Sequence, residues 1–378
     1  MDVLLQIPAV VFGYIIPTLI ILTVVVFVHE MGHFLVARWC GIRVAAFSVG
    51  FGQELAGFTD RRGTRWKLSA IPLGGYVRFE GDENVASIPD PDKLAETPVS
   101  ERKGLFHFAP LWKRFAVVLA GPAANFLLAI LVFAAVFVSI GRPQMLPVVG
   151  KVVAGSAAEE AGIEPGDRIV SVDGRGIDTF EQLQGIVRLA AGEPLLVVVD
   201  RNSEQLTLTA TPRRESQSNG FGGSHRVGVL GIQADNETFS FDRDDPVTAV
   251  VEGTRKTGEI VELTLTYLGR LLRGRENTDQ LSGPIGIGQT IGQIPSFSGR
   301  IYLTAVLSVS IGLFNLFPVP MLDGGHLLFY LIEALRGRPL SPRVQDLGFR
   351  IGFALVIMLF IFVTFNDIAV RSGLFVTS

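Results

Sequence analysis

Long uncharged apolar runs alternate with polar stretches along this chain. Three runs have the length of a membrane-spanning helix and a fourth is shorter; they cover residues 10–28, 115–140, 301–322 and 351–365. About 20 apolar residues, at 1.5 Å per residue, cross a hydrocarbon core of roughly 30 Å. The pattern therefore predicts four transmembrane helices, which we place within residues 1–37, 115–140, 301–335 and 347–370.

The first polar stretch, residues 38–114, contains a dozen Lys and Arg residues. Short basic loops stay on the cytoplasmic side of a membrane, so the first helix is predicted to run from outside to inside. Within this loop, residues 47–52 and 66–79 are apolar and are punctuated by Gly and Pro, which is typical of short strands. We expect a β-hairpin that dips into the membrane, shielded by protein or by a wet cavity.

Residues 141–300 have the composition of a soluble domain, and the same topology places them outside the membrane. A PDZ domain is predicted over 145–213, because residues 155–174 resemble the core of one. They are followed by a helix expected at 180–189 and by strands expected at 195–200 and 205–211. PDZ domains bind extended chain ends in a groove between a strand and a helix. A domain that only gates access by size is the alternative, and both readings stay open.

Residues 214–245 are rich in Ser, Gly and Asn and are predicted to be a linker, in which His225 is a solvated surface residue. Residues 246–300 follow with an amphipathic helix over 246–273 and a Ser-Gly-Pro-Ile-Gly segment. That helix either lies on the membrane surface or packs against the spans.

The composition agrees with this division. Of 378 residues, 48% are hydrophobic and only 18% are charged, and the mean hydropathy is +0.41. The predicted fold class is therefore a polytopic α-helical membrane protein of about four transmembrane helices, with a membrane-associated β-hairpin and an inserted external PDZ (α+β) domain. A net charge of −3 gives no electrostatic case for nucleic-acid binding. The single cysteine, Cys40, excludes an intrachain disulfide and is expected to be a packing residue.

Candidate chemistry lies at the end of the first run, where His29, Glu30 and His33 form a His-Glu-x-x-His motif. On a helix the two histidines are one turn apart and face the same way, so both can bind one zinc ion, while Glu30 can take a proton from the attacking water. Two surface histidines beside a solvated glutamate would be the ordinary alternative. Within a membrane segment nothing would solvate Glu30, and ionisable residues there indicate a functional site.

The third run supplies a carboxylate. Its two prolines break the helix before Asp323, and Arg residues follow from Arg336 onward, so this end is also predicted to be cytoplasmic. Topology alone therefore brings Asp323 to the face that holds the histidines. As a third ligand it would leave the fourth position of a catalytic zinc open. The alternatives are a helix cap for Asp323, and His326 as the ligand, although Gly324-Gly325 gives no reason to prefer His326.

Asn125 lies inside the second run, four residues after Gly121. A buried amide needs hydrogen-bond partners, so Asn125 is expected either near the metal or against a neighbouring helix. Gly121 is expected to allow close helix packing.

With these motifs the chain resembles the site-2 proteases, which are zinc intramembrane metalloproteases, and among them the bacterial regulator-of-sigma-E protease branch. The resemblance covers nearly the whole chain. It is carried by the histidine motif, the Gly-Phe-Gly and Pro-Leu-Gly-Gly-Tyr-Val loop, the Gly121-x-x-x-Asn125 pair, the PDZ core, the Ser-Gly-Pro-Ile-Gly segment and the Asn-x-x-Pro-x-x-x-x-Asp-Gly motif at 315–324. Relatives of this branch often carry two PDZ domains and this chain has one clear copy, so size-exclusion rules from two-domain relatives need not apply.

The resemblance implies roles for individual residues. His29, His33 and Asp323 would be the zinc ligands and Glu30 the catalytic residue. Substrate would be bound by Asn315, with Asn125 as a further candidate, and would pair with the 66–79 hairpin through Leu68, Ala70, Leu73 and Gly74.

It also implies partners and a location. The substrates would be single-pass membrane proteins whose outer part has been trimmed, such as an anti-sigma factor or a leftover signal peptide, cut in regulated intramembrane proteolysis during a stress response. The protein would sit in the bilayer of a bacterial inner membrane, with a periplasmic PDZ domain open to a peptide ligand and an active site towards the cytoplasm.

Two other classes of protein would use part of this pattern. A membrane metal-binding or transport protein would explain the histidines but would give no role to Glu30, and no internal repeat of the kind common in transporters is seen. A catalytically idle PDZ scaffold would not need a complete ligand set. Replacement of Glu30 by Gln separates these classes, because it should abolish proteolysis and leave metal binding largely intact.

Overall fold

A computed structural model describes residues 11–81, 97–98, 102–218, 224–235, 238–274 and 282–371. Most of residues 82–103, in the basic stretch, lie outside this part of the chain. Two compact units are present: a membrane unit, Met1–Val136 with Pro246–Ser378, and an inserted unit, Phe137–Asp245.

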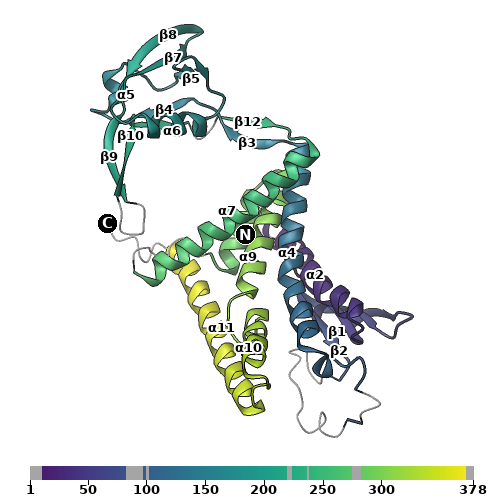
Figure 1. Ribbon diagram of the computed structural model, residues 1–378. Coiled ribbons are helices and arrows are strands. Elements are labelled where there is room, and N and C mark those ends of the chain that lie inside the picture. Colours follow the sequence, from purple (N-terminus) through teal and green to yellow (C-terminus); the bar gives the residue numbers. More distant parts are fainter. Residues whose placement is uncertain are drawn as a thin grey trace. The chain divides into compact units, whose positions relative to one another are not determined.

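The membrane unit contains the four long apolar helices that the sequence predicts (Figure 1). They are α2 (Ile16–Trp39, preceded by a π-helical turn at Val11–Ile15), α4 (Leu111–Ser139), α9 (Phe297–Asn315) and α11 (Pro342–Arg371). Large apolar side chains point outward from them; on α11, for example, Phe353, Met358 and Ile361 are each more than half exposed. Contiguous exposed apolar surface of this kind matches a lipid environment rather than water.

The third span is broken, as its prolines predict. Helix α9 ends at Asn315, and α10 (Asp323–Arg336) begins after a loop over 316–322. The loop folds tightly onto α10: a Cβ on Gly324 would lie 2.2 Å from the carbonyl oxygen of Phe317. It also packs against α11, where a Cβ on Gly352 would lie 1.7 Å from the oxygen of Pro320. These glycines let the backbones approach closely and so fix where α10 starts.

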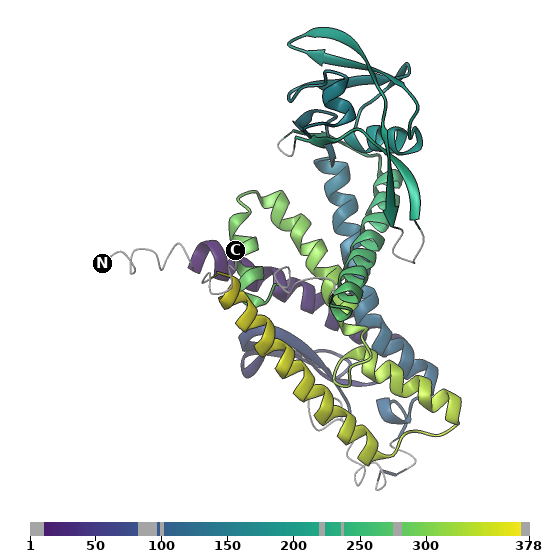
Figure 2. The same ribbon diagram turned by 90° about the vertical axis from the view of Figure 1, so that its left-hand side faces the viewer.

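The predicted hairpin forms two strands that are longer than expected, β1 (Val44–Thr59) and β2 (Arg65–Phe79). Both strands bend, with positive φ at Gly50, Gly52 and Gly74. As a result the first half of β1 has a stretch of β2 on each side: Phe47 pairs with Val77 and also with Trp66, whereas the second half of β1 pairs with residues 65–69. Figure 2 shows this sheet beside α2.

A buried apolar cluster joins the sheet to the helices around it. It includes the 3-10 turn η2 (Phe106–Phe108), and its buried members are Phe34, Ala37, Ile42, Val44, Phe47, Val77, Phe79, Phe106, Val117, Val118 and Tyr330. The cluster therefore connects α2, the sheet, α4 and α10.

Two further helices complete the membrane unit, α7 (Pro246–Leu272) and α8 (Pro284–Gln293). Helix α7 is amphipathic as predicted, and it packs against the spans: a Cβ on its Gly253 would lie 2.9 Å from the oxygen of Ile130 in α4. The first turn of α8 is bound by α11, because the Asp367 carboxylate accepts hydrogen bonds from the amides of Gly283 and Gly286 at 3.0 and 2.8 Å.

The inserted unit contains a four-stranded sheet in the order β6-β5-β7-β8 and three strand pairs, β9 with β10, β4 with β11, and β3 with β12. The core elements of the predicted domain are present. They are β5 (Arg168–Val172), α6 (Phe180–Leu189), β7 (Leu195–Arg201) and β8 (Glu204–Ala210). The unit also contains β3 (Arg142–Met145), β4 (Val149–Val152), α5 (Ala157–Glu160) and β6 (Arg175–Gly176). Helix α6 starts at Thr179, whose side chain accepts a hydrogen bond from the amide of Gln182. The PDZ assignment stays a prediction.

The predicted linker at 214–245 instead contains strands. These are β9 (Arg213–Ser218), β10 (Ser224–Val229), β11 (Ile232–Ala234) and β12 (Phe239–Asp242). Strand β11 pairs with β4 and β12 pairs with β3, and Val227 and Leu230 are buried. The unit therefore extends well beyond 145–213, because the last strands pair with the first ones.

Candidate metal centre

His29 and His33 lie one turn apart on α2 and face the same way, as the four-residue spacing predicts. Both are buried, their rings meet edge to face with centroids 4.8 Å apart, and their Nε2 atoms are 3.2 Å apart. Two ring nitrogens therefore point at one place inside the membrane unit.

Asp323, the first residue of α10, reaches the same place. Its Oδ2 atom lies 3.0 Å from Nε2 of His29 and 3.5 Å from Nε2 of His33. The three potential ligand atoms are all within 4.8 Å of one another. Asp323 Oδ2 is buried and makes no hydrogen bond, although the two imidazoles are beside it. A buried carboxylate oxygen without a hydrogen bond requires an explanation, and a cation between these three atoms supplies one.

The donor set fits zinc. Two imidazole nitrogens and one carboxylate oxygen are the ligands of many catalytic zinc sites, in which a fourth position stays open. His33 is already oriented for this role, because its Nδ1 lies 2.8 Å from the backbone oxygen of Val117. Nδ1–H donates to that oxygen, which leaves the Nε2 lone pair for a metal.

Asn125 of α4 contacts the other histidine. Its side chain has no exposed surface, its amide nitrogen lies 3.2 Å from Nδ1 of His29, and its Oδ1 is buried without a hydrogen bond. The side-chain amide of Asn125 fits the same space with its oxygen and nitrogen exchanged. Reversing this amide lets Oδ1 accept the Nδ1–H of His29, which satisfies the oxygen and leaves Nε2 of His29 for the metal.

Gly121, one turn before Asn125, makes room for the imidazoles. A Cβ at this position would lie 2.3 Å from Nε2 of His33 and 2.9 Å from Cε1 of His29. The Gly-x-x-x-Asn pair thus combines a residue that leaves space with one that orients a ring. Helix α9 holds this part of α4 in place, because Ser308 Oγ donates to the backbone oxygen of Asn125 at 2.8 Å.

Glu30 lines the same cavity, which has a volume of about 350 Å³. Its carboxylate accepts a hydrogen bond from the backbone of Val77, and its Cγ would lie 3.4 Å from a Cβ on Gly75. A carboxylate beside three metal-binding atoms, held by the edge of a strand, is suitably placed to move a proton. Described residues that line the cavity are His29, Glu30, His33, Phe51, Gly75, Tyr76, Val77, Phe79, Phe106, Val117, Val118, Asn315, Met321, Leu322, Asp323, His326 and Tyr330.

Only some of the residues expected to contact substrate lie at the cavity that holds the three metal-binding residues. Asn315 lines the cavity from the end of α9. Leu68 and Ala70 are exposed and do not belong to the described lining, and Gly74 only precedes it. The side chain of Leu73 lies outside the described part of the structure. His326 lines the cavity, but the group of converging donors found among the described residues is His29, His33 and Asp323.

Strand β2 lines the cavity through residues 75–77 and Phe79, which lie inside the 66–79 hairpin expected to pair with substrate but were not singled out within it. Its signal was present in the Gly-Gly-Tyr-Val part of the loop motif. A Cβ on Gly75 would lie 2.7 Å from the oxygen of Ser48, so only glycine lets this strand approach β1 beside Glu30.

Comparison with known proteins places this geometry in context. A family profile described as Peptidase family M50 matches residues 17–359. A protein of Agrobacterium fabrum named as a candidate zinc metalloprotease is 51% identical over 365 residues, which is 96% of this chain and 97% of that protein. A similarly named protein of Rhizobium meliloti is 51% identical over 360 residues, 94% of this chain and 96% of its own. The metalloprotease MmpA of Caulobacter vibrioides is 42% identical over 374 residues, covering 93% of this chain and 94% of that protein.

Proposed function

The chain belongs to peptidase family M50 and is a zinc metalloprotease, and on that premise we propose that it cuts peptide bonds within or near the transmembrane segments of single-pass membrane proteins. Its substrates would be proteins whose outer part has already been removed, such as anti-sigma factors and signal-peptide remnants. The observation that carries the proposal is the convergence of His29, His33 and Asp323 beside Glu30, in a unit of helices long and apolar enough to span a membrane.

In this proposal each residue has a separate task. His29, His33 and Asp323 would hold the zinc ion, which would supply Lewis-acid polarisation of the peptide carbonyl and of the attacking water. Glu30 takes a proton from the attacking water and returns it to the leaving amine. Asn125 orients the His29 ring, and Asn315, which lines the cavity, holds the substrate backbone. Every proton that moves thus passes through Glu30, which makes this residue the sharpest test of the mechanism.

A helical substrate must unwind locally before it is cut, because helix hydrogen bonds occupy its carbonyl groups. Strand addition would offset that cost, since new main-chain hydrogen bonds replace the lost ones. Residues 75–77 are the part of β2 that lines the cavity, and β1 pairs with them on one side. We therefore assign substrate pairing to 75–77 ahead of Leu68, Ala70, Leu73 and Gly74.

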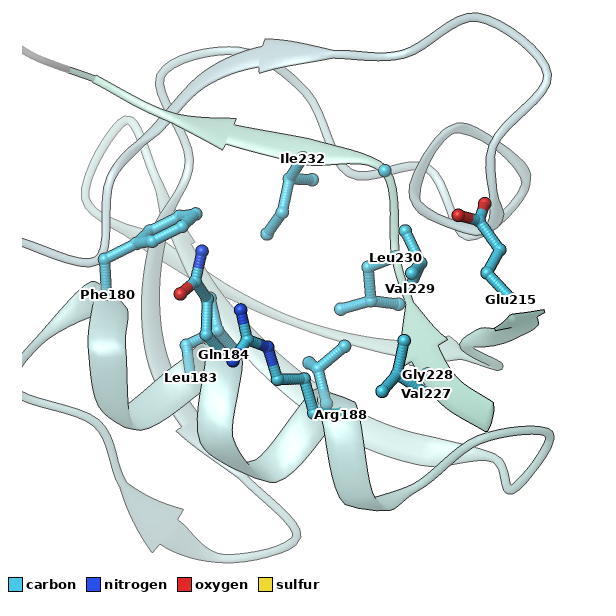
Figure 3. A pocket seen from close by; sticks show the side chains of 12 residues that line it. Phe180, Leu183, Gln184, Arg188, Glu215, Val227, Gly228, Val229, Leu230 and Ile232 are labelled. Carbon is cyan, nitrogen blue, oxygen red and sulfur yellow. The ribbon is translucent and has the colours of Figure 1, made fainter. Parts of the chain in front are cut away.

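The inserted unit is proposed to be a PDZ domain that binds a peptide. A cavity of about 250 Å³ lies between α6 and the segment from Val227 to Ile232. In Figure 3, Phe180 and Gln184 project from the helix towards this segment. A groove between a helix and a strand segment is the place where PDZ domains accept an extended chain. A purely steric gate would need no such groove, although gating by size is compatible with it.

The location follows from charge. The basic loop at 38–114 and the Arg residues after α10 are proposed to face the cytoplasm of a bacterium, with the inserted unit in the periplasm. The metal centre would then lie towards the cytoplasmic side of the inner membrane.

The test is cleavage of a tagged single-pass protein, with its outer part trimmed, in membranes that contain wild type, Glu30→Gln or Asp323→Asn. Zinc content is measured on each purified protein. Both variants should lose cleavage, and zinc should remain in Glu30→Gln and be depleted in Asp323→Asn. Cleavage by Glu30→Gln would exclude the proposed mechanism, and full zinc occupancy in Asp323→Asn would remove Asp323 from the ligand set.

A further inference from the structure

An ion pair joins two helices of the membrane unit away from the metal centre. Arg114 at the start of α4 donates two hydrogen bonds to Glu333 near the end of α10, at 2.6 and 3.2 Å. The side chains are 15% and 16% exposed, and the Arg114 guanidinium lies 5.0 Å from the ring centroid of Tyr330. Two parallel bonds between ionised groups combine strength with a defined geometry.

The pair matters because of where α10 begins. Asp323 is its first residue, and the loop over 316–322 separates it from α9, so a continuous helix does not set its position. The attachments of α10 therefore decide where Asp323 lies. Among the described residues these include Leu327 and Tyr330 in the apolar cluster with α4, ring contacts of His326 and Phe329 with Phe349 of α11, and the Arg114–Glu333 pair.

Helix α4 contributes no metal ligand, yet it contacts the groups that do. Val117 binds Nδ1 of His33, Asn125 binds Nδ1 of His29, and Gly121 leaves the space between them. Arg114 lies on the same helix, less than one turn before Val117. Helix α4 thus contacts both histidines and also the helix that carries Asp323.

We propose that Arg114 and Glu333 are positioning residues, which hold α10 in register with α4 so that Asp323 meets the two histidines. This rests on the ligand set of the proposed function. Apolar contacts tolerate sliding, because they are not directional. A bidentate pair does not, because both hydrogen bonds weaken as soon as one helix shifts along the other.

The competing explanation is that the pair only stabilises the fold. The two explanations differ in what they predict for the metal. A fold-stabilising bridge, once broken, lowers thermal stability and leaves the zinc affinity of the folded molecules unchanged. A positioning pair, once broken, weakens zinc binding in molecules that are still folded.

The experiment uses the full-length protein in lipid nanodiscs. Zinc dissociation constants are measured by competition with a chelator, and the Co²⁺-loaded proteins are compared by absorption spectrum. The variants are Glu333→Gln, the exchanged pair Arg114→Glu/Glu333→Arg, Asp323→Asn, and the control Asp346→Asn. The control breaks the ion pair between Asp346 and Arg350, whose side chains are 57% and 77% exposed, respectively.

Glu333→Gln is expected to weaken zinc binding by about 10- to 100-fold, the range found when contacts that orient metal ligands are lost. Its Co²⁺ spectrum should change, the exchanged pair should recover most of the affinity, and Asp346→Asn should match wild type. If the exchanged pair fails to fold, Glu333→Gln and its spectrum decide the question.

Wild-type zinc affinity and an unchanged spectrum in folded Glu333→Gln would overturn the proposal, whatever happens to thermal stability. Wild-type zinc affinity in Asp323→Asn would instead show that the ligand set is wrong, so the two failures are distinguishable.

Discussion

Two aspartates with buried carboxylate oxygens, one in each unit, are held in opposite ways. Asp167 in the inserted unit has no exposed side-chain surface, and both of its oxygens are occupied: Arg201 donates to them at 2.7 and 2.8 Å and the Glu164 amide donates at 2.9 Å. Asp323 in the membrane unit has a buried Oδ2 that receives no hydrogen bond. Asp167 is paired with the permanent charge of an arginine, whereas, among the described residues, Asp323 Oδ2 faces only the imidazoles of His29 and His33.

This difference distinguishes a carboxylate that stabilises the fold from one that binds a ligand. A buried charge that is fully paired serves the fold, since its partner compensates for its lost hydration. A buried carboxylate oxygen that the protein leaves without a hydrogen bond costs stability, and it persists where a ligand supplies the missing partner. The following predictions test this contrast.

The largest expected effect on stability is that of Asp167→Asn. It removes the charge that pairs with the partly buried Arg201 and should destabilise the inserted unit by about 2 kcal/mol, the scale of a hydrogen bond to a charged group. The loss is limited because Arg201 keeps its contacts with Glu164 and the Gly162 oxygen. Hydrogen exchange of the inserted unit in the full-length protein measures the effect.

Asp323→Asn is the matched control, and in the zinc-free protein it should leave the membrane unit as stable as wild type or more so. Equal destabilisation by the two changes would mean that Asp323 is a fold-stabilising group like Asp167, and the contrast would fail.

A smaller effect is expected at Asn125, whose amide contacts His29. Asn125→Leu should weaken zinc binding by about 10- to 100-fold, because the His29 ring loses the group that orients it. Asn125→Asp keeps an acceptor oxygen and should retain more affinity than Leu. Chelator competition on both proteins checks the order, and a Leu variant that binds zinc better than the Asp variant would rule out the orienting role.

The smallest effect is the acid response of the inserted unit. Burial raises the pKa of Asp167. The hydrogen bonds from Arg201 and the Glu164 amide, together with the charge of Arg201, lower it by more, so the pKa lies below its ordinary value. The stabilisation is therefore complete above the unfolded pKa of about 3.9 and is lost as pH falls through the folded pKa. Hydrogen exchange corrected for intrinsic rates should show this loss in wild type. The same series in Asp167→Asn should lack that component, and identical profiles for the two proteins would contradict the assignment.

The sequence predicted the parts that depend on local periodicity and topology. Helical spacing alone aligns His29 with His33, and the structure brings Asp323 beside them, as the pattern of basic loops predicted. These inferences need no knowledge of tertiary packing.

Features that depend on distant partners were harder to predict. Residues 214–245 look like a linker because their Ser, Gly and Asn content hides strands that pair with β3 and β4, far earlier in the chain. The lining stretch at 75–77 was not singled out because β2 bends at Gly74, where φ is +121°. Residues 75–77, after this bend, line the cavity, whereas Leu68 and Ala70, before it, are exposed and do not. The bend depends on the fit of β2 against β1 and α2, which a single sequence does not show.

Gly121 leaves the room in which the His33 imidazole can point at the other two ligands. The carbon atom it lacks would lie 2.3 Å from Nε2 and 2.5 Å from Cε1 of His33, so it would press against the ring itself. One added methyl group would therefore turn an imidazole out of place while every atom that binds the ion is still present. The metal centre thus depends on the three side chains that reach inward and equally on the volume that a fourth residue leaves empty.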